Sequence, residues 1–110
     1  MSEPLLIYTT WPDAESALAF AAEALKARLI ACANIGAPMI SVYRWEGAVE
    51  QSAETPMLLK TTAAAADALR SRFLERHPYE TPAFVALPLQ AAACHGPFLD
   101  WIEAETSRTE

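Results

Sequence analysis

The chain is poor in basic residues, and this shortage excludes two classes of partner. It holds 8 Lys and Arg against 14 Asp and Glu in 110 residues, which gives a formal net charge of −6. Nucleic-acid binding proteins carry clustered cations that displace counterions from phosphates, whereas the few cations here are scattered. Binding to an anionic membrane surface needs basic runs as well. We therefore expect neither a nucleic-acid nor a membrane partner.

Glycine, cysteine and long apolar runs are scarce too. Three glycines argue against a glycine-rich phosphate loop. The two cysteines, Cys32 and Cys94, do not form the disulfide framework of a small secreted domain. No apolar run reaches the roughly 20 residues that span a bilayer, and no positively charged stretch like that of a secretory signal is present. We therefore expect a cytoplasmic protein with reduced thiols.

The elements that are present predict one α+β domain over residues 1–110. An apolar, β-forming run covers 5–10, and a helix capped by Asp13 follows to about Arg28. A strand from 30 to about 44 is interrupted at Pro38, because proline cannot donate to a sheet ladder. The chain turns at Glu46-Gly47 and returns over about 49–62. A helix over about 63–76, a strand over 82–88 and a short last helix complete the order.

This order, β-α-β-β-α-β plus a C-terminal helix, predicts a ferredoxin-like fold. In such a fold an antiparallel sheet carries two helices on one face. Apolar residues recur at helical spacing in both helices and predict the sides that pack on the sheet. These residues are Ala14, Leu18, Ala21, Leu25 and Leu29 for the first helix, and Ala66, Leu69 and Phe73 for the second.

The opposite face of the sheet is expected to need a cover of its own. We place Tyr43, Trp45 and Met57 on that face, where they are too apolar to remain in water. The long arms of the hairpin also carry backbone donors and acceptors that need partners. Strand pairing between copies would meet both needs, so we predict that these three residues lie at an interface between subunits.

Chemically active side chains are few, and each has a plain structural alternative. His77 and Glu80 lie in one short loop and could hold copper or zinc, but they could equally cap the helix and bond locally. Lys60 lies in an apolar strand and must be paired, either with Glu80 or with a ligand. Cys32 could be a nucleophile close to Arg28 or His77, or simply a small buried hydrophobe. Cys94 and His95 are neighbours that could hold a soft metal or could simply be an ordinary loop pair.

Seven stretches of the chain, in order and at matching gaps, resemble the CutA family, the divalent-cation tolerance proteins. Together they cover nearly the whole chain. They are Thr9-Thr10-Trp11-Pro12-Asp13, Leu29-Ile30-Ala31-Cys32-Ala33-Asn34-Ile35, Ser41-Val42-Tyr43-Arg44-Trp45-Glu46-Gly47, Leu59-Lys60-Thr61-Thr62, His77-Pro78-Tyr79-Glu80-Thr81-Pro82, Ala86-Leu87-Pro88 and Leu99-Asp100-Trp101-Ile102.

The resemblance implies a ferredoxin-like fold assembled as a tight homotrimer, with strands paired between subunits and an architecture similar to that of the PII signalling proteins. It also implies a link to tolerance of copper and other divalent metals, with no enzyme activity firmly attached. Cys32, Lys60, Tyr79 and Glu80 match the family pattern and would line a cleft between subunits.

Two positions depart from family members that are credited with copper ligation. Thr9 stands where those members have a cysteine, and Arg76 stands where some have the first of two histidines. His77 is the one matching ligand, and a cation at position 76 would oppose a metal ion nearby. The resemblance therefore implies weak metal binding at most.

Three hypotheses follow for the function. The first is a non-catalytic trimer without an obligatory cofactor, which binds a divalent cation such as copper through His77 and Glu80, with Cys32 as a possible third ligand. Lys60, Arg76 and Tyr79 would instead favour another small ligand, for example an anion, in the same intersubunit cleft. The second is a PII-like signalling or scaffold protein that acts on protein partners through the hairpin tip. The third, an enzyme with a cysteine nucleophile, has no supporting catalytic motif.

Overall fold

The computed structural model describes residues 2–107, in which strands and helices follow one another as the sequence predicts. No helix among these residues has the length and apolar character needed to cross a bilayer. The elements are β1 (Pro4–Trp11), α1 (Ala14–Lys26), β2 (Cys32–Ile35), β3 (Met39–Trp45), β4 (Ala48–Thr62), α2 (Ala63–Arg76), β5 (Phe84–Pro88), the short 3-10 helix η1 (Ala91–Ala93) and α3 (Gly96–Glu105).

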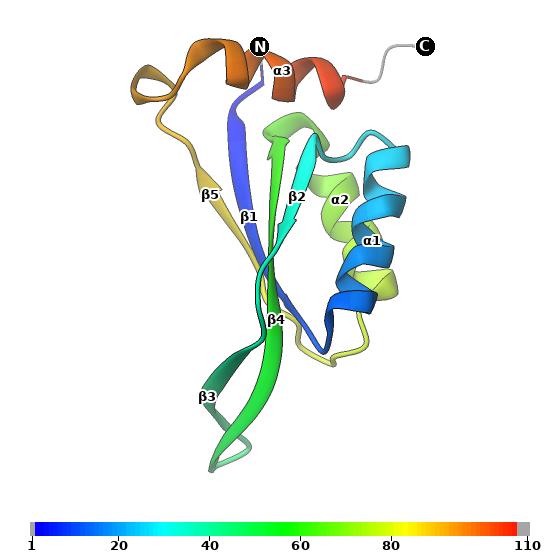
Figure 1. The fold of residues 1–110 in the computed structure, drawn as a ribbon, viewed down its shortest axis with the longest axis vertical. Helices are drawn as coiled ribbons and strands as arrows, with labels where there is room; N and C mark the ends of the chain where they lie inside the picture. Colours follow the sequence, from blue (N-terminus) through cyan, green and yellow to red (C-terminus); the bar gives the residue numbers. More distant parts are fainter. Residues whose placement is uncertain (1, 108–110) are drawn as a thin grey trace.

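The sheet has the strand order β2-β4-β1-β5, and each neighbouring pair is antiparallel. Helices α1 and α2 lie on one face of the sheet, and α3 lies across the end at which β1 begins (Figure 1). β3 pairs only with the first half of β4, so these two strands continue as a hairpin away from the rest of the molecule (Figure 1). The ferredoxin-like α+β prediction is confirmed.

Helix starts show why the chain folds into these elements. The Asp13 side chain accepts a hydrogen bond from the Ser16 backbone N–H at 2.8 Å, which caps α1 as predicted. The start of α2 is capped from a distance. Ser2 Oγ accepts from the Ala64 N–H at 2.8 Å, and the carbonyl of Glu3 accepts from the backbone N–H that follows Thr62 at 2.7 Å. The segment before β1 therefore secures the first turn of α2.

Two glycines fix the course of the long hairpin. Gly47 has φ +83° and the preceding Glu46 has φ 50°, so the two-residue turn predicted at this point is confirmed. At Gly36 an added Cβ would lie 3.0 Å from Cγ of the Pro56 ring, so a side chain there would require this ring to shift.

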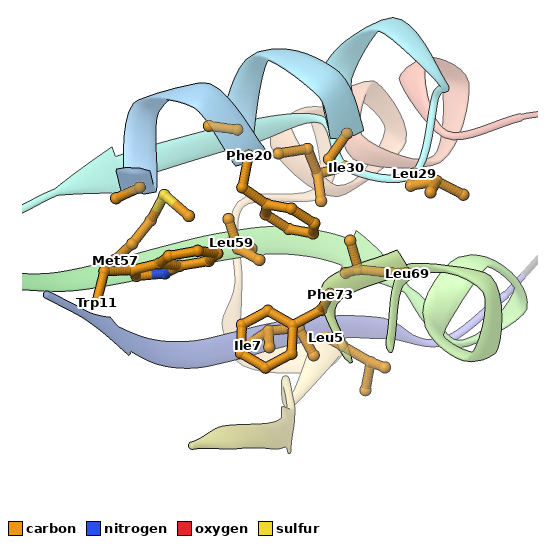
Figure 2. Packing of buried hydrophobic residues seen from close by; sticks show 13 residues of the cluster. Leu5, Ile7, Trp11, Phe20, Leu29, Ile30, Met57, Leu59, Leu69 and Phe73 are labelled. Atoms are coloured by element: carbon orange, nitrogen blue, oxygen red, sulfur yellow. The ribbon is translucent and has the colours of Figure 1, made fainter. Parts of the chain in front are cut away.

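The core lies between the sheet and the two helices (Figure 2). Trp11, at the end of β1, lies 5.4 Å between ring centroids from Phe20 of α1 and 5.4 Å from Phe73 of α2. The two phenylalanine rings also meet edge to face at 5.8 Å. Aliphatic side chains from β1 and β4, such as Ile7 and Leu59, fill the space beneath these rings.

The predicted buried side of α1 is confirmed at Ala21, and Leu29 just after the helix is buried too, but the prediction is wrong at Leu18 and Leu25. Leu18 and Leu25 are 61% and 44% exposed. The helix turns Phe20 inward instead, because this ring packs on the two aromatic rings of the core and excludes more water than a leucine does. The buried residues of α1 are Ala17, Phe20, Ala21 and Ala24. In α2, Leu69 and Phe73 are buried as predicted, and Ala65 rather than the half-buried Ala66 completes the stripe.

Met57 is wrongly predicted as an interface residue, since it is fully buried inside this chain. Side chains alternate along β4, so Met57 and Leu59 face the helices while Leu58 and Lys60 face the opposite side. The prediction was displaced by one residue, and in a strand a shift of one residue exchanges the two faces.

We predict that Phe73→Ala lowers the free energy of unfolding by about 3–5 kcal/mol, because it leaves a cavity beside the rings of Trp11, Phe20 and Phe84. The matched control is Leu74→Ala, on the neighbouring position of α2, which is 56% exposed. This control should change stability by no more than about 0.5 kcal/mol. Urea denaturation of both variants at one protein concentration measures the difference, and equal losses would contradict the packing described.

Candidate functional site

His77 follows the last residue of α2, and its ring is held from both sides. Its Nε2 lies 2.8 Å from the carbonyl oxygen of Thr10, and its Nδ1 accepts from the backbone N–H of Tyr79 at 3.2 Å. A nitrogen that accepts cannot carry the proton of a neutral ring, so Nε2 carries it and donates to Thr10. Both nitrogens are therefore occupied, and the ring ties the loop after α2 to β1.

The surroundings of His77 favour this neutral form. Its ring centroid lies 4.3 Å from that of Trp11 and 4.9 Å from that of Phe73. Burial lowers the pKa of His77, although its bond to Thr10 and the negative charge of Glu54 act in the opposite direction. The backbone N–H of His77 caps α2 by donating to the Phe73 carbonyl at 2.9 Å, while its side chain serves β1.

The two positions that depart from the copper-binding pattern are also occupied by structural bonds. Thr9 is fully buried, donates to the Met57 carbonyl at 2.9 Å and accepts from the Trp11 indole at 2.8 Å. Arg76 lies on the surface and pairs with Glu23 of α1 at 3.0 Å, and this pairing lowers the pKa of Glu23. Neither side chain is available to a ligand beside His77.

Cys32 and Lys60 lie together, far from His77 in this chain. They face each other across β2 and β4, and Lys60 donates a hydrogen bond to Asn34. Lys60 also lies opposite Leu6 of β1, whereas His77 is bonded four residues further along that strand. Four strand residues span about 13 Å. One chain therefore does not bring Cys32 to His77.

Of the two alternatives for Lys60, the ion pair with Glu80 is not formed among residues 2–107. Lys60 finds its partner in Asn34, and Glu80 lies in the loop after α2, which leads away from that part of the sheet. The lysine is also only half-buried. Because its ammonium group reaches the uncovered side of the sheet, an amide partner is enough and no buried ion pair is required.

A groove of about 650 Å³ separates the hairpin from the loop after α2. The hairpin contributes Tyr43, Trp45 and four residues with a carboxylate or hydroxyl group, and the loop contributes Tyr79 and Glu80. Of the predicted cleft residues, only Tyr79 and Glu80 come together here. The full lining is Thr10, Pro12, Ser41, Tyr43, Trp45, Glu50, Ser52, Ala53, Glu54, Tyr79, Glu80, Thr81 and Ala83.

The groove is negative and aromatic. Glu54 accepts from the Ser41 hydroxyl at 2.6 Å, which fixes its carboxylate at the base of the hairpin. Burial and the neighbouring Glu54 raise the pKa of Tyr79 to about 12, so its hydroxyl keeps its proton. The lining contains three glutamates and no lysine, arginine or histidine. It therefore favours a cationic group over an anion.

The model of one protein family, described as CutA1 divalent ion tolerance protein, matches residues 5–105. The chain belongs to this family. A divalent-cation tolerance protein CutA of Thermus thermophilus is 40% identical over 106 residues, which cover 96% of this chain and 99% of the relative.

Solved structures of the CutA1 family share the fold over nearly the full length. CutA1 from the psychrotrophic bacterium Shewanella sp. SIB1 has a TM-score of 0.91 at 38% identity and covers 98% of both chains. A protein of Archaeoglobus fulgidus, described as a periplasmic divalent cation tolerance protein, has a TM-score of 0.89 at 34% identity, covering 94% of this chain and 99% of its own.

The residues of a single chain do not fit a copper ion. Within residues 2–107, no group of three His, Cys, Asp or Glu side chains is placed to hold a metal. The one histidine that matches the copper-binding pattern uses both ring nitrogens for bonds inside the protein. A metal at His77 would have to break the bond to Thr10 or the bond to Tyr79. We therefore derive no chemistry from a metal at this position.

Two groove residues, Glu50 and Glu54, were not singled out in the sequence. The turn at Glu46-Gly47 is the sequence signal that predicts their position. A two-residue turn places Tyr43 opposite Glu50, and alternation then sets Glu54 on the same side of the hairpin.

We predict that His77 makes stability depend on pH. Its folded-state pKa is lowered, so the unfolded chain binds the proton more readily and the stabilisation is complete above the unfolded value of about 6.5. Stability should fall as the pH drops below that value towards the folded-state pKa. His77→Gln should remove this component of the slope. His95→Gln, at an exposed histidine, is the matched control and should keep it.

Urea midpoints of the three proteins between pH 5 and pH 8 measure the effect. A wild-type slope that survives in His77→Gln would show that other groups are responsible.

Proposed function

We propose that this chain works as a homotrimeric, non-catalytic divalent-cation tolerance protein of the cytoplasm, whose small-ligand sites are clefts between subunits. Membership in the CutA1 family supports the role in cation tolerance. The observation that carries the assembly is an apolar face of the sheet that no helix among residues 2–107 covers (Figure 1).

This uncovered face has a definite composition. Residues that pair directly across strands share a face, so Leu6 lies beside Leu87, and Tyr8 lies between Leu58 and Val85. Val85 and Leu87 are 47% and 44% exposed. A contiguous apolar surface of this kind is typical of an interface. The family resemblance supplies the number of subunits, and this surface supplies the driving force for assembly.

The same face carries the groups expected in a ligand cleft. Cys32, Asn34 and Lys60 lie at its β2 edge, with the lysine already held by the asparagine. A second copy laid over the face would enclose these polar groups and give a small ligand more than one wall. The role of Cys32 in this proposal is that of a lining residue rather than a nucleophile.

A weak divalent-cation site would draw on two copies. Cys32 and Glu80 are the remaining candidate ligands, since both ring nitrogens of His77 are bonded and no three His, Cys, Asp or Glu side chains within residues 2–107 are grouped to hold a metal. The proposal therefore needs no obligatory metal.

A PII-like role in signalling or scaffolding is the second candidate. The hairpin extends beyond the sheet, and Ile40, Val42 and Val49 are 74%, 66% and 66% exposed on one side of it. Surfaces of this kind suit contact with another protein.

Assembly through the uncovered face predicts that Val85→Asp dissociates the protein, because a charge would have to be buried at the interface. The matched control is Leu18→Asp, on the outer side of α1, where the wild-type side chain is 61% exposed. Sedimentation velocity should show a trimer for the wild type and the control, and a smaller species for Val85→Asp. A trimer that tolerates Val85→Asp would remove this face from the interface.

Copper binding should not depend on His77. We expect a calorimetric titration with Cu(II), in a weakly coordinating buffer, to give the same heat for the wild type and for His77→Gln. Glu80→Gln and Cys32→Ser are the comparison variants, and any weak saturable heat should fall in these two. Saturable binding at one site per subunit that is lost only in a folded His77→Gln variant would contradict the proposal.

A further inference from the structure

We propose that the groove between the hairpin and the loop after α2 is completed by Arg44 of a neighbouring copy. This inference rests on the proposed assembly and adds to it the residue that enters the groove and the direction in which the copies follow one another.

The groove has the chemistry of a guanidinium site. Tyr43, Trp45 and Tyr79 supply aromatic faces, and the half-exposed rings of the first two have room for a planar cation. Glu50 and Glu80 are exposed and have no ion-pair partner among residues 2–107. Carboxylates beside aromatic rings favour arginine over lysine, because a guanidinium group stacks and bonds in two directions at once.

Arg44 is a cation of the hairpin that has no ion-pair or hydrogen-bond partner among residues 2–107. Most basic side chains of the described part are engaged with acids, and Lys60 is bonded to Asn34. Arg44 and Lys26 are left without a partner within residues 2–107. Lys26 ends α1, whereas Arg44 lies on the hairpin itself. Arginine at the centre of an interface is commonly a residue that contributes much of the binding energy.

The two faces of the hairpin are complementary. Tyr43, Trp45 and Glu50 point into the groove, and Arg44 points to the opposite face because it pairs with Val49 in the alternate register. On that face Arg44 is surrounded by exposed Ile40 and Val42. An arginine with an apolar border on one side therefore matches an acidic, aromatic groove on the other side.

Complementary faces on one element produce contact from head to tail. The Arg44 face of one hairpin meets the groove of the next, and a closed ring results when the rotation between copies is that of the trimer. Arg44 cannot enter the groove of its own chain, since Arg44 and Glu50 lie on opposite sides of the same ribbon. Each groove is thus incomplete without a second copy.

The test reverses the charges one side at a time. Arg44→Glu should weaken assembly by at least about tenfold in the dissociation constant, because it places a like charge against the glutamates. The control Lys26→Glu makes the same change in net charge at the unpaired cation outside the hairpin and should leave assembly unchanged. Sedimentation across a protein dilution series in moderate urea gives the dissociation constant, and circular dichroism confirms that each variant is folded.

The rescue variant identifies the direction of contact. Arg44→Glu combined with Glu50→Arg and Glu80→Arg in one chain should restore assembly, because every contact in the ring is again between opposite charges. Mixing the Arg44→Glu chain with a Glu50→Arg, Glu80→Arg chain should not restore it. A ring of three built from two kinds of chain always contains one contact between like chains.

Arg44→Glu that assembles as tightly as Lys26→Glu would overturn the inference while leaving the trimer standing. Failure of the combined variant to assemble, with the chain still folded, would also overturn it. A wild-type protein that stays monomeric at all concentrations would instead overturn the proposed assembly on which the inference rests.

Discussion

Strand β4 imposes one alternation of side chains on the whole molecule. Its second half pairs with β1 and β2, and its first half pairs with β3, so a single register decides which residues face the helices, the uncovered face and the groove. The turn at Glu46-Gly47 sets that register at one end. The packing of Met57 and Leu59 against the helices fixes it further along. A slip of one residue would bury Lys60 and expose Leu59.

The neutral ring of His77 joins the second helix to this sheet. The ring packs against Trp11 and Phe73 and donates a hydrogen bond to the Thr10 carbonyl. These contacts fix the start of the loop that forms one wall of the groove. In the family pattern the same histidine suggests a metal ligand. Here both ring nitrogens of His77 make hydrogen bonds within the protein, so the ring has no free lone pair for a metal ion.

Periodicity and turn chemistry were sufficient to predict the order of the elements, the cap at Asp13, the hairpin turn and the bounds of α2. They failed where a shift of one residue exchanges the two faces of a strand, and where a rotation of a helix changes its buried side. The buried side of α1 depends on the packing of Phe20 against Trp11 and Phe73, which belong to other elements. The spacing of apolar residues within the helix does not predict these contacts. Met57 was assigned to the wrong face because that assignment did not follow the alternation of side chains that starts at the Glu46-Gly47 turn.

The site was harder to predict than the fold, since its parts depend on distances between elements. Resemblance grouped Cys32, Lys60, Tyr79 and Glu80 in one cleft, yet within a chain two of them lie on the uncovered sheet and two lie in the groove. Strand register and aromatic packing stabilise this fold, and neither of them requires a metal ion. The side chains that a neighbouring copy or a ligand would contact in the proposed assembly are the apolar ones of the uncovered face and the acidic ones of the groove.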